Sequence, residues 1–237
     1  MSDDISDIEK WQGKYPFLQT VWDTYNEFDI PIQETDRGSE NYARVCEKIV
    51  ENYNELDANH KEFCRKLVRN LGCYNYKNEY SNPLHYQCHI LYNWIYNQIK
   101  KYGELDDIIT KCFNNCISLM NFTGVKHKCS YDLYNTVYKD PIKMTIIDIF
   151  NNNMQNIINK LIIEHEYDNE ASAQNFLCEF VNLYKVIYGK HCKDKNERDT
   201  YDKITCYMLE SFRDSYTYYF YYNEKIVKKY YIPSLYN

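Results

Sequence analysis

Residues 88–99 read CHILYNWIYNQI. Cys88, Leu91, Tyr92, Ile95 and Ile99 fall at i, i+3, i+4, i+7 and i+11, which places them on one face of an α-helix. The stretch therefore predicts a core helix that carries a cysteine on its buried stripe. The role of that cysteine depends on the rest of the chain.

Apolar stripes with the same helical spacing recur along the whole sequence, and no segment alternates cleanly with period two. They lie within residues 17–28, 42–53, 63–71, 105–120, 142–161, 176–187 and 204–219. Helix-start residues precede many of them (Pro16, Ser39, Asp57, Asn82-Pro83, Asp140-Pro141, and Asp168 or Asn169), and Gly72, Gly103, Gly124 and Gly189 follow. The sequence predicts an all-α fold of about seven to nine helices in one disulfide-crosslinked domain over residues 1–237, with a flexible acidic start at residues 1–12.

The composition narrows the classes of function. The chain has 237 residues, a formal net charge of −6 and a sequence pI of about 5.6. A surface with this charge is poorly suited to nucleic acid, so we expect no nucleic-acid partner. The 27 tyrosines are accompanied by abundant Asn, Ile and Lys, which are all served by A/T-rich codons. The tyrosine count therefore carries little weight as a sign of a binding surface.

Cysteine usage is the most informative part of the composition. We assign all 10 cysteines to disulfides: Cys46, Cys64, Cys73, Cys88, Cys112, Cys116, Cys129, Cys178, Cys192 and Cys206. An even number suits a disulfide framework in an oxidising compartment, or else buried thiols or metal ligands. The acidic start MSDDISDIEKWQGKYPF lacks a signal-peptide core, and no run of 18 apolar residues predicts a membrane span. A cytosolic protein, unconventional export and a fragment of a longer protein all remain open.

For Cys88 we predict a disulfide to Cys64 or to Cys73. Consecutive helices with a short connection usually pack antiparallel, so the buried faces that carry Cys64 and Cys88 should meet. Cys73 lies just past Gly72, at the end from which the next helix starts. The alternative is that Cys88 is a buried thiol.

Metal and catalytic patterns are weak. His85 and His89 form an i, i+4 pair without the glutamate of a zinc protease, and paired CxxC knuckles are absent, so a structural zinc is the minor alternative. The run 168–179 fails as a calcium loop because Ala173 stands where glycine is needed. Asn121 begins one glycosylation triplet. We expect no enzyme activity, no catalytic residues, no metal and no cofactor.

Two segments carry a resemblance to a known family. Phe63-Cys64-Arg65-Lys66-Leu67-Val68-Arg69-Asn70-Leu71 is followed by Cys88 and then Leu91-Tyr92-Asn93-Trp94-Ile95-Tyr96. This order resembles the Plasmodium interspersed repeat (PIR) superfamily, which includes the Vir proteins of Plasmodium vivax, although Asn and Tyr are exchanged relative to the usual order. Downstream, Cys129 to Tyr134, Cys178, Cys192 and Cys206 are similar to later family positions.

The resemblance implies an exported variant surface antigen, displayed on or in the infected red cell. It implies roles in antigenic variation, immune evasion and host-receptor adhesion, with host receptors or antibodies as partners. Family members usually end in a transmembrane helix, which this sequence lacks, so membrane attachment would need a segment outside it. The alternative is an intracellular helical scaffold with reduced thiols.

Overall fold

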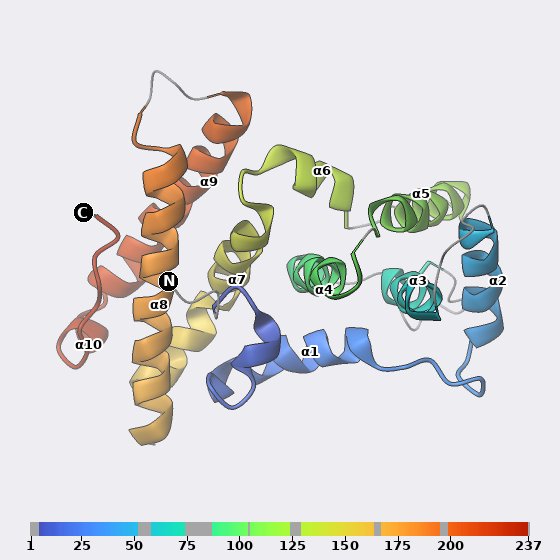
Figure 1. Cartoon of the computed structure of the whole chain (residues 1–237). Helices are drawn as coiled ribbons and strands as arrows, with labels where there is room; N and C mark the ends of the chain where they lie inside the picture. Colours follow the sequence, from blue (N-terminus) through green and yellow to red (C-terminus); the bar gives the residue numbers. More distant parts are fainter. Residues whose placement is uncertain are drawn as a thin grey trace. The chain divides into compact units, whose positions relative to one another are not determined.

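The computed structural model describes residues 5–51, 58–73, 87–103, 105–123, 129–163, 167–194 and 199–236, and all of its regular elements are helices (Figure 1). The all-α prediction is confirmed. The α-helices are α1 (Gln19–Asp29), α2 (Ser39–Val50), α3 (Ala58–Leu71), α4 (Gln87–Tyr102), α5 (Asp106–Thr123), α6 (Tyr131–Val137), α7 (Pro141–Ile163), α8 (Tyr167–His191), α9 (Thr200–Tyr216) and α10 (Glu224–Val227). Three short helices of other types are η1 (Ile8–Trp11), η2 (Pro16–Leu18) and the π-helix η3 (Thr217–Tyr221).

The number of α-helices that the structure describes is larger than the predicted seven to nine, because it includes two short helices, α6 and α10. Seven residues and four residues are too few to show a helical stripe in the sequence. The tertiary structure supports both, since Tyr131 of α6 and Ile226 of α10 are buried.

The contacts within the chain form two compact units where the sequence predicts one domain. Unit 1 combines both ends of the chain, residues 1–23 and 134–237, and unit 2 consists of residues 24–133. Long stripes give no sign of this division, because a helix such as α1 can contribute residues to both units without a break.

Unit 2 is organised around Trp94, in the middle of the α4 stretch quoted above. Its side chain is fully buried and stacks on Phe63 of α3, with 5.4 Å between ring centroids. The Trp94 indole Nε1 donates a hydrogen bond to Asp29 Oδ1 at 3.2 Å, and Lys66 Nζ approaches the same oxygen at 3.1 Å. The end of α1 is therefore held by polar groups from α3 and α4.

The end of α1 is also capped by α3. Arg69 donates hydrogen bonds to the carbonyl oxygens of Ile30 (2.7 Å), Phe28 (2.9 Å) and Glu27 (3.0 Å), and Asn70 Nδ2 donates to Phe28 O at 2.9 Å. The last carbonyls of a helix have no partner within it. Arg69 and Asn70 supply those partners, which accounts for a half-buried polar pair at the end of an apolar stripe.

Unit 1 is organised around an aromatic cluster. Phe150 of α7 stacks on Phe180 of α8, with ring centroids 3.9 Å apart, and on Phe176 at 5.6 Å. Phe212 of α9 meets the Phe150 ring edge-on at 5.4 Å. Such aromatic contacts add stability beyond the burial of apolar area.

The expected flexible start differs from the structure in residues 5–12. Ile8 and Trp11 are fully buried, Ile5 nearly so, and Trp11 packs edge-on against Phe176 with centroids 5.5 Å apart. Ile5, Ile8 and Trp11 recur every third residue, which suits the 3₁₀-helix η1. The acidic residues between them obscured this pattern.

Glycine ends two helices as predicted. Gly72 after α3 has φ 72° and Gly103 after α4 has φ 76°, a conformation that costs glycine little. Gly189 does not end α8, which continues to His191. The predicted starts at Asp57 and Asn82-Pro83 and the end at Gly124 lie outside the described residues.

Candidate functional site

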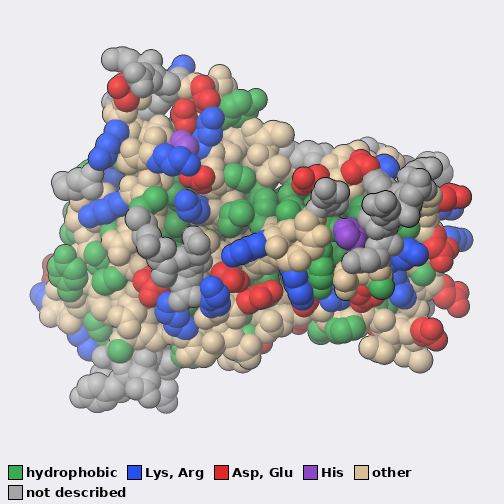
Figure 2. Space-filling view, in the orientation of Figure 1, with side chains coloured by type: hydrophobic (Ala, Val, Ile, Leu, Met, Phe, Trp, Pro, Cys, Tyr) green, Lys and Arg blue, Asp and Glu red, His purple; other side chains and the backbone are tan. Residues whose placement is uncertain are grey.

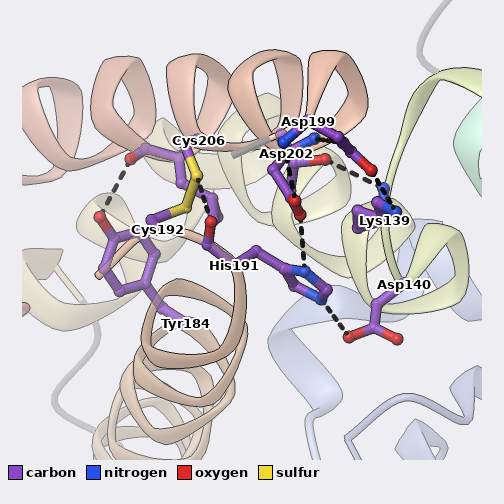
Figure 3. The surroundings of a disulfide bond; sticks show 10 residues. Lys139, Asp140, Tyr184, His191, Cys192, Asp199, Asp202 and Cys206 are labelled. Atoms are coloured by element: carbon purple, nitrogen blue, oxygen red, sulfur yellow. Dashed lines mark hydrogen bonds and ion pairs between the residues drawn. A yellow bond between two sulfur atoms is a disulfide. The ribbon is translucent and has the colours of Figure 1, made fainter. Parts of the chain in front are cut away.

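A polar cluster joins α7, α8 and α9 in unit 1 (Figure 3). His191, the last residue of α8, lies between two carboxylates. Its Nδ1 is 2.9 Å from Asp202 Oδ1 in the first turn of α9, and its Nε2 is 3.1 Å from Asp140 Oδ2 just before α7. Lys190 Nζ reaches Asp140 Oδ2 at 3.1 Å. Both imidazole nitrogens therefore have acceptors.

Local sequence explains how α9 presents Asp202. Asp199 is the N-cap: its side chain accepts from the Asp202 backbone N–H at 2.7 Å, and the Asp202 side chain accepts from the Asp199 N–H at 3.4 Å. This reciprocal pair is a capping box. Lys139 Nζ lies 2.9 Å from Asp199 Oδ2. The same turn thus fixes the start of α9 and orients a carboxylate toward His191.

The charges in this cluster offset one another. Burial raises the pKa of the Asp140 carboxyl, but hydrogen bonds from His191 and Lys190 outweigh burial, so that the pKa lies below its usual value. A hydrogen bond from Lys139 likewise lowers the pKa of Asp199. With both ring nitrogens of His191 in contact with carboxylates, the arrangement is suited to holding α7, α8 and α9 together.

A disulfide closes the same junction. Cys192 follows α8 directly and pairs with Cys206 of α9, with Cα atoms 5.5 Å apart. The Tyr184 hydroxyl of α8 donates to Leu209 O of α9 at 3.2 Å (Figure 3). The α8–α9 connection is therefore held by a covalent bond and by the polar cluster.

A second candidate feature is the exposed aromatic end of unit 1. We call residues 217–236 the tyrosine-rich segment. Its exposed side chains are Tyr218, Tyr219, Tyr221, Tyr222, Tyr231 and Tyr236, together with Glu224, Lys225, Val227, Lys228 and Lys229. Tyr222 and Tyr231 are 74% and 75% exposed, which is unusual for rings of this size.

The tyrosine-rich segment is anchored to the rest of unit 1 at several points. Ile226 is fully buried, the Tyr216 hydroxyl donates to Pro233 O at 3.0 Å, and the Tyr221 hydroxyl donates to Ile232 O at 3.2 Å. The Arg213 guanidinium lies 5.3 Å from the centre of the Tyr236 ring. An anchored backbone presents the exposed rings in a fixed arrangement, which lowers the entropy cost of contacting a partner.

Tyrosine is enriched at the energetic centres of protein interfaces because its ring is large, rigid and amphipathic. The tyrosine-rich segment is therefore the best candidate for an interaction surface in the described part of the chain. As a single count, the 27 tyrosines carry little weight as a sign of a binding surface. The signal that could have identified this segment is the run SYTYYFYYNEKIVKKYYIPSLY. In this run, aromatic rings outnumber the aliphatic residues needed to bury them.

On the face shown in Figure 2, acidic and basic side chains are interspersed.

The structure places eight of the predicted cysteines in four disulfides. The pairs are Cys46–Cys64, Cys73–Cys116, Cys88–Cys129 and Cys192–Cys206. Cys112 and Cys178 are free thiols, so their assignment to disulfides is wrong. Cys112 faces Cys64, but Cys64 is already bonded to Cys46. Cys178 lies in α8 of unit 1, where the other two cysteines, Cys192 and Cys206, are bonded to each other.

The predicted partner of Cys88 is also wrong. Cys88 is oxidised, but its partner is Cys129 rather than Cys64 or Cys73. Cys129 lies two residues before Tyr131, the first residue of α6, which packs against Tyr92 and Tyr96 of α4 with ring centroids 5.9 and 5.8 Å apart. Tyr92 accepts from the Ser130 backbone N–H at 2.6 Å. These contacts bring Cys129 to the start of α4. Cys64 of α3 is instead bonded to Cys46 of α2, and Cys73, just after α3, is bonded to Cys116 of α5.

The weaker patterns can be placed only in part. His85 lies outside the described residues, and His89 packs edge-on against Tyr92 at 6.1 Å. Over the described ranges, no group of three His, Cys, Asp or Glu side chains is arranged to hold a metal ion. The run 168–179 is helical within α8, and Asn121 lies near the end of α5.

Within the part of the chain that the structure describes, no helix combines the length and the apolar character needed to cross a membrane.

Comparison with known proteins identifies no relative: no family model, no curated protein and no solved structure matches the chain.

Proposed function

We propose that the chain is an exported variant surface antigen of the PIR superfamily, of Vir type, displayed on or in the infected red cell. It acts without catalysis, in immune evasion and in adhesion to host receptors, and antibodies are its other partners. The observation that carries the proposal is the set of four disulfides. Disulfides persist in oxidising surroundings and are rare where thioredoxin and glutathione keep thiols reduced.

The residues that carry the family resemblance support the same proposal. Arg69 and Asn70 cap α1, and Trp94 fills the centre of unit 2. Residues with these structural roles can remain while exposed loops and side chains vary, which is what an antigen under immune pressure requires.

A count of free thiols tests where the protein works. The protein is isolated from infected cells, trapped at once with an alkylating reagent and denatured. The proposal expects two thiols, Cys112 and Cys178. A count near 10 would favour the intracellular scaffold with reduced thiols and would overturn the surface-antigen proposal.

Adhesion and recognition are tested separately. Purified oxidised protein is assayed for binding to red cells, to endothelial receptors and to immune sera from infected hosts. If the tyrosine-rich segment is the contact surface, the double variant Tyr222→Ala/Tyr231→Ala lowers cell binding by about tenfold or more, since buried interface tyrosines often contribute above ~1.4 kcal/mol each.

The matched control is Tyr207→Ala on α9, a 71% exposed tyrosine outside the segment, which should leave binding unchanged. Binding to no cell type and recognition by no immune serum would contradict the antigen proposal. Equal loss in the control and the double variant would exclude the segment as the contact surface.

A further inference from the structure

Three sulfur atoms meet in the interior of unit 2. Cys64 of α3 is bonded to Cys46 of α2, and the free thiol of Cys112 on α5 lies 3.7 Å from the Cys64 sulfur. Cys64 and Cys112 are 0% and 1% exposed. A free thiol in van der Waals contact with a disulfide sulfur is a potential nucleophile toward that sulfur.

The neighbouring crosslink keeps this contact in place. Cys116, one helical turn beyond Cys112 on the same face of α5, is bonded to Cys73 just after α3. Cys116 also packs against the end of α3, with its sulfur 4.0 Å from Leu71 O. Because α5 is tied to the end of α3, Cys112 stays beside Cys64 even when α2 moves.

We propose that Cys64 has two alternative partners, and that thiol–disulfide exchange with Cys112 converts the Cys46–Cys64 crosslink into a Cys64–Cys112 crosslink. The Cys112 thiolate attacks the Cys64 sulfur, the Cys64–Cys112 bond forms and the Cys46–Cys64 bond breaks. Cys46 leaves as a thiolate and takes up the proton that Cys112 gave up. The step conserves the number of disulfides and needs no external oxidant or reductant.

The geometric demand of this step is small. A disulfide has a sulfur–sulfur distance of about 2.05 Å, so the Cys64 and Cys112 sulfurs must approach by roughly 1.7 Å. Side-chain rotation accounts for shifts of this size.

The exchange changes which helix is covalently attached. In one form α2 is bonded to α3, and in the other α3 and α5 are joined twice while α2 is held only by packing of side chains such as Tyr42, Ile49 and Val50. α2 is then free to open at lower cost, and Cys46 becomes the free thiol. The isomer is therefore a switch in the local stability of α2.

Burial also sets when exchange occurs. It raises the pKa of the Cys112 thiol, so that the reactive thiolate is scarce while the core is closed. Exchange therefore takes place during folding, or when α2 opens and admits water. The folded protein can then retain either pairing.

The test is a thiol count on the full chain with Cys46→Ser, refolded with oxidised and reduced glutathione and alkylated after denaturation. If Cys112 takes over Cys64, one free thiol remains, Cys178; if it does not, Cys64, Cys112 and Cys178 all react, a threefold higher count. Peptide mapping without reduction should recover the Cys64–Cys112 bond. Cys112→Ser is the matched control: it should retain Cys46–Cys64 and also show one free thiol.

A second measurement covers a variant that fails to fold. Wild-type protein is held in buffer without glutathione, with increasing urea below its unfolding transition, trapped with acid and alkylated. We expect a growing fraction of Cys64–Cys112 peptides accompanied by alkylated Cys46. Recovery of Cys64 only with Cys46 in the wild type, or as a thiol in Cys46→Ser, would overturn the proposal.

Discussion

Arg69 is a surface-accessible arginine with a structural task. Its guanidinium donates to three carbonyl oxygens at the end of α1, and burial lowers its pKa. A lysine has one ammonium group and cannot reach all three acceptors in this fixed geometry. We expect Arg69→Ala to lower the free energy of unfolding by about 2–3 kcal/mol and Arg69→Lys by about half of that.

Urea denaturation followed by circular dichroism measures these changes. Arg44→Lys, an exposed arginine that contacts Asn41 on its own helix, is the control and should change stability by less than about 0.5 kcal/mol. If Arg69→Lys behaved like this control, the capping role of Arg69 would be refuted.

Asp148 is a buried carboxyl in α7 that accepts from the Tyr134 hydroxyl at 3.0 Å. Burial raises its pKa to about 6, although the Tyr134 hydrogen bond opposes this. Between the unfolded pKa near 4 and pH 6, the native state keeps a proton that the unfolded chain loses, so this group makes the protein less stable as pH rises. Above pH 6 the cost is fully present.

We expect Asp148→Asn to remove this pH dependence and to raise stability above pH 6 by roughly 2–3 kcal/mol. Asparagine can still accept from Tyr134. Unfolding curves are measured at pH 4.5 and pH 7.5. In the variant, the free energy of unfolding should no longer change between these pH values by the amount that the Asp148 carboxyl contributes in the wild type. Asp107→Asn, whose carboxyl is 62% exposed, is the control and should retain the wild-type slope. The same slope in Asp148→Asn would show that another group titrates.

At the scale of elements, the α8–α9 junction combines a disulfide with charged contacts. Cys192 and Cys206 are 14 residues apart, and closing a loop of this length stabilises the fold by about 3 kcal/mol in the chain-entropy model. We expect the double variant Cys192→Ser/Cys206→Ser to lose about this amount and remain folded, because His191 still joins Asp140 and Asp202.

Chemical denaturation under non-reducing conditions measures the loss. Cys178→Ser removes a cysteine from α8 without removing a crosslink, and should cost less than about 1 kcal/mol. An equal loss in both variants would mean that the Cys192–Cys206 bond contributes nothing of its own.

At the scale of the whole molecule, the two units differ in what stabilises them. Unit 2 contains three disulfides, whereas unit 1 contains one and is built on the Phe150 cluster. The Cys73–Cys116 and Cys88–Cys129 bonds each close a loop of more than 40 residues. Each such bond is worth about 4 kcal/mol in the chain-entropy model, though overlapping loops are not additive.

We therefore expect reduction to weaken unit 2 more than unit 1. Hydrogen exchange with mass spectrometry, with and without dithiothreitol, should show loss of protection in α2, α3, α4 and α5 before α7 and α8. The control is oxidised protein alkylated only at its native free thiols, Cys112 and Cys178, which shows any effect of alkylation itself. Simultaneous loss in all of these helices would indicate that the chain unfolds as one cooperative unit.

The sequence alone determined the longer helices, though not the short α6 and α10. Residues 88–99 form the core helix that their spacing predicts, and Leu67, Val68 and Leu71 are buried as the α3 stripe requires. Gly72 ends that helix for a local reason, its positive φ. These features were predictable because helical periodicity and helix ends depend on residues a few positions apart.

Only the tertiary structure decided the partners. Cys112 and Cys116 lie on one stripe of α5, yet one is a free thiol and the other is bonded to Cys73. Cys88 likewise meets Cys129, which α6 positions, rather than a cysteine of the preceding helix. A stripe defines which side chains are buried, but not which other helix covers them. That choice depends on packing between residues far apart in the chain, and a disulfide forms only where that packing brings two sulfur atoms together.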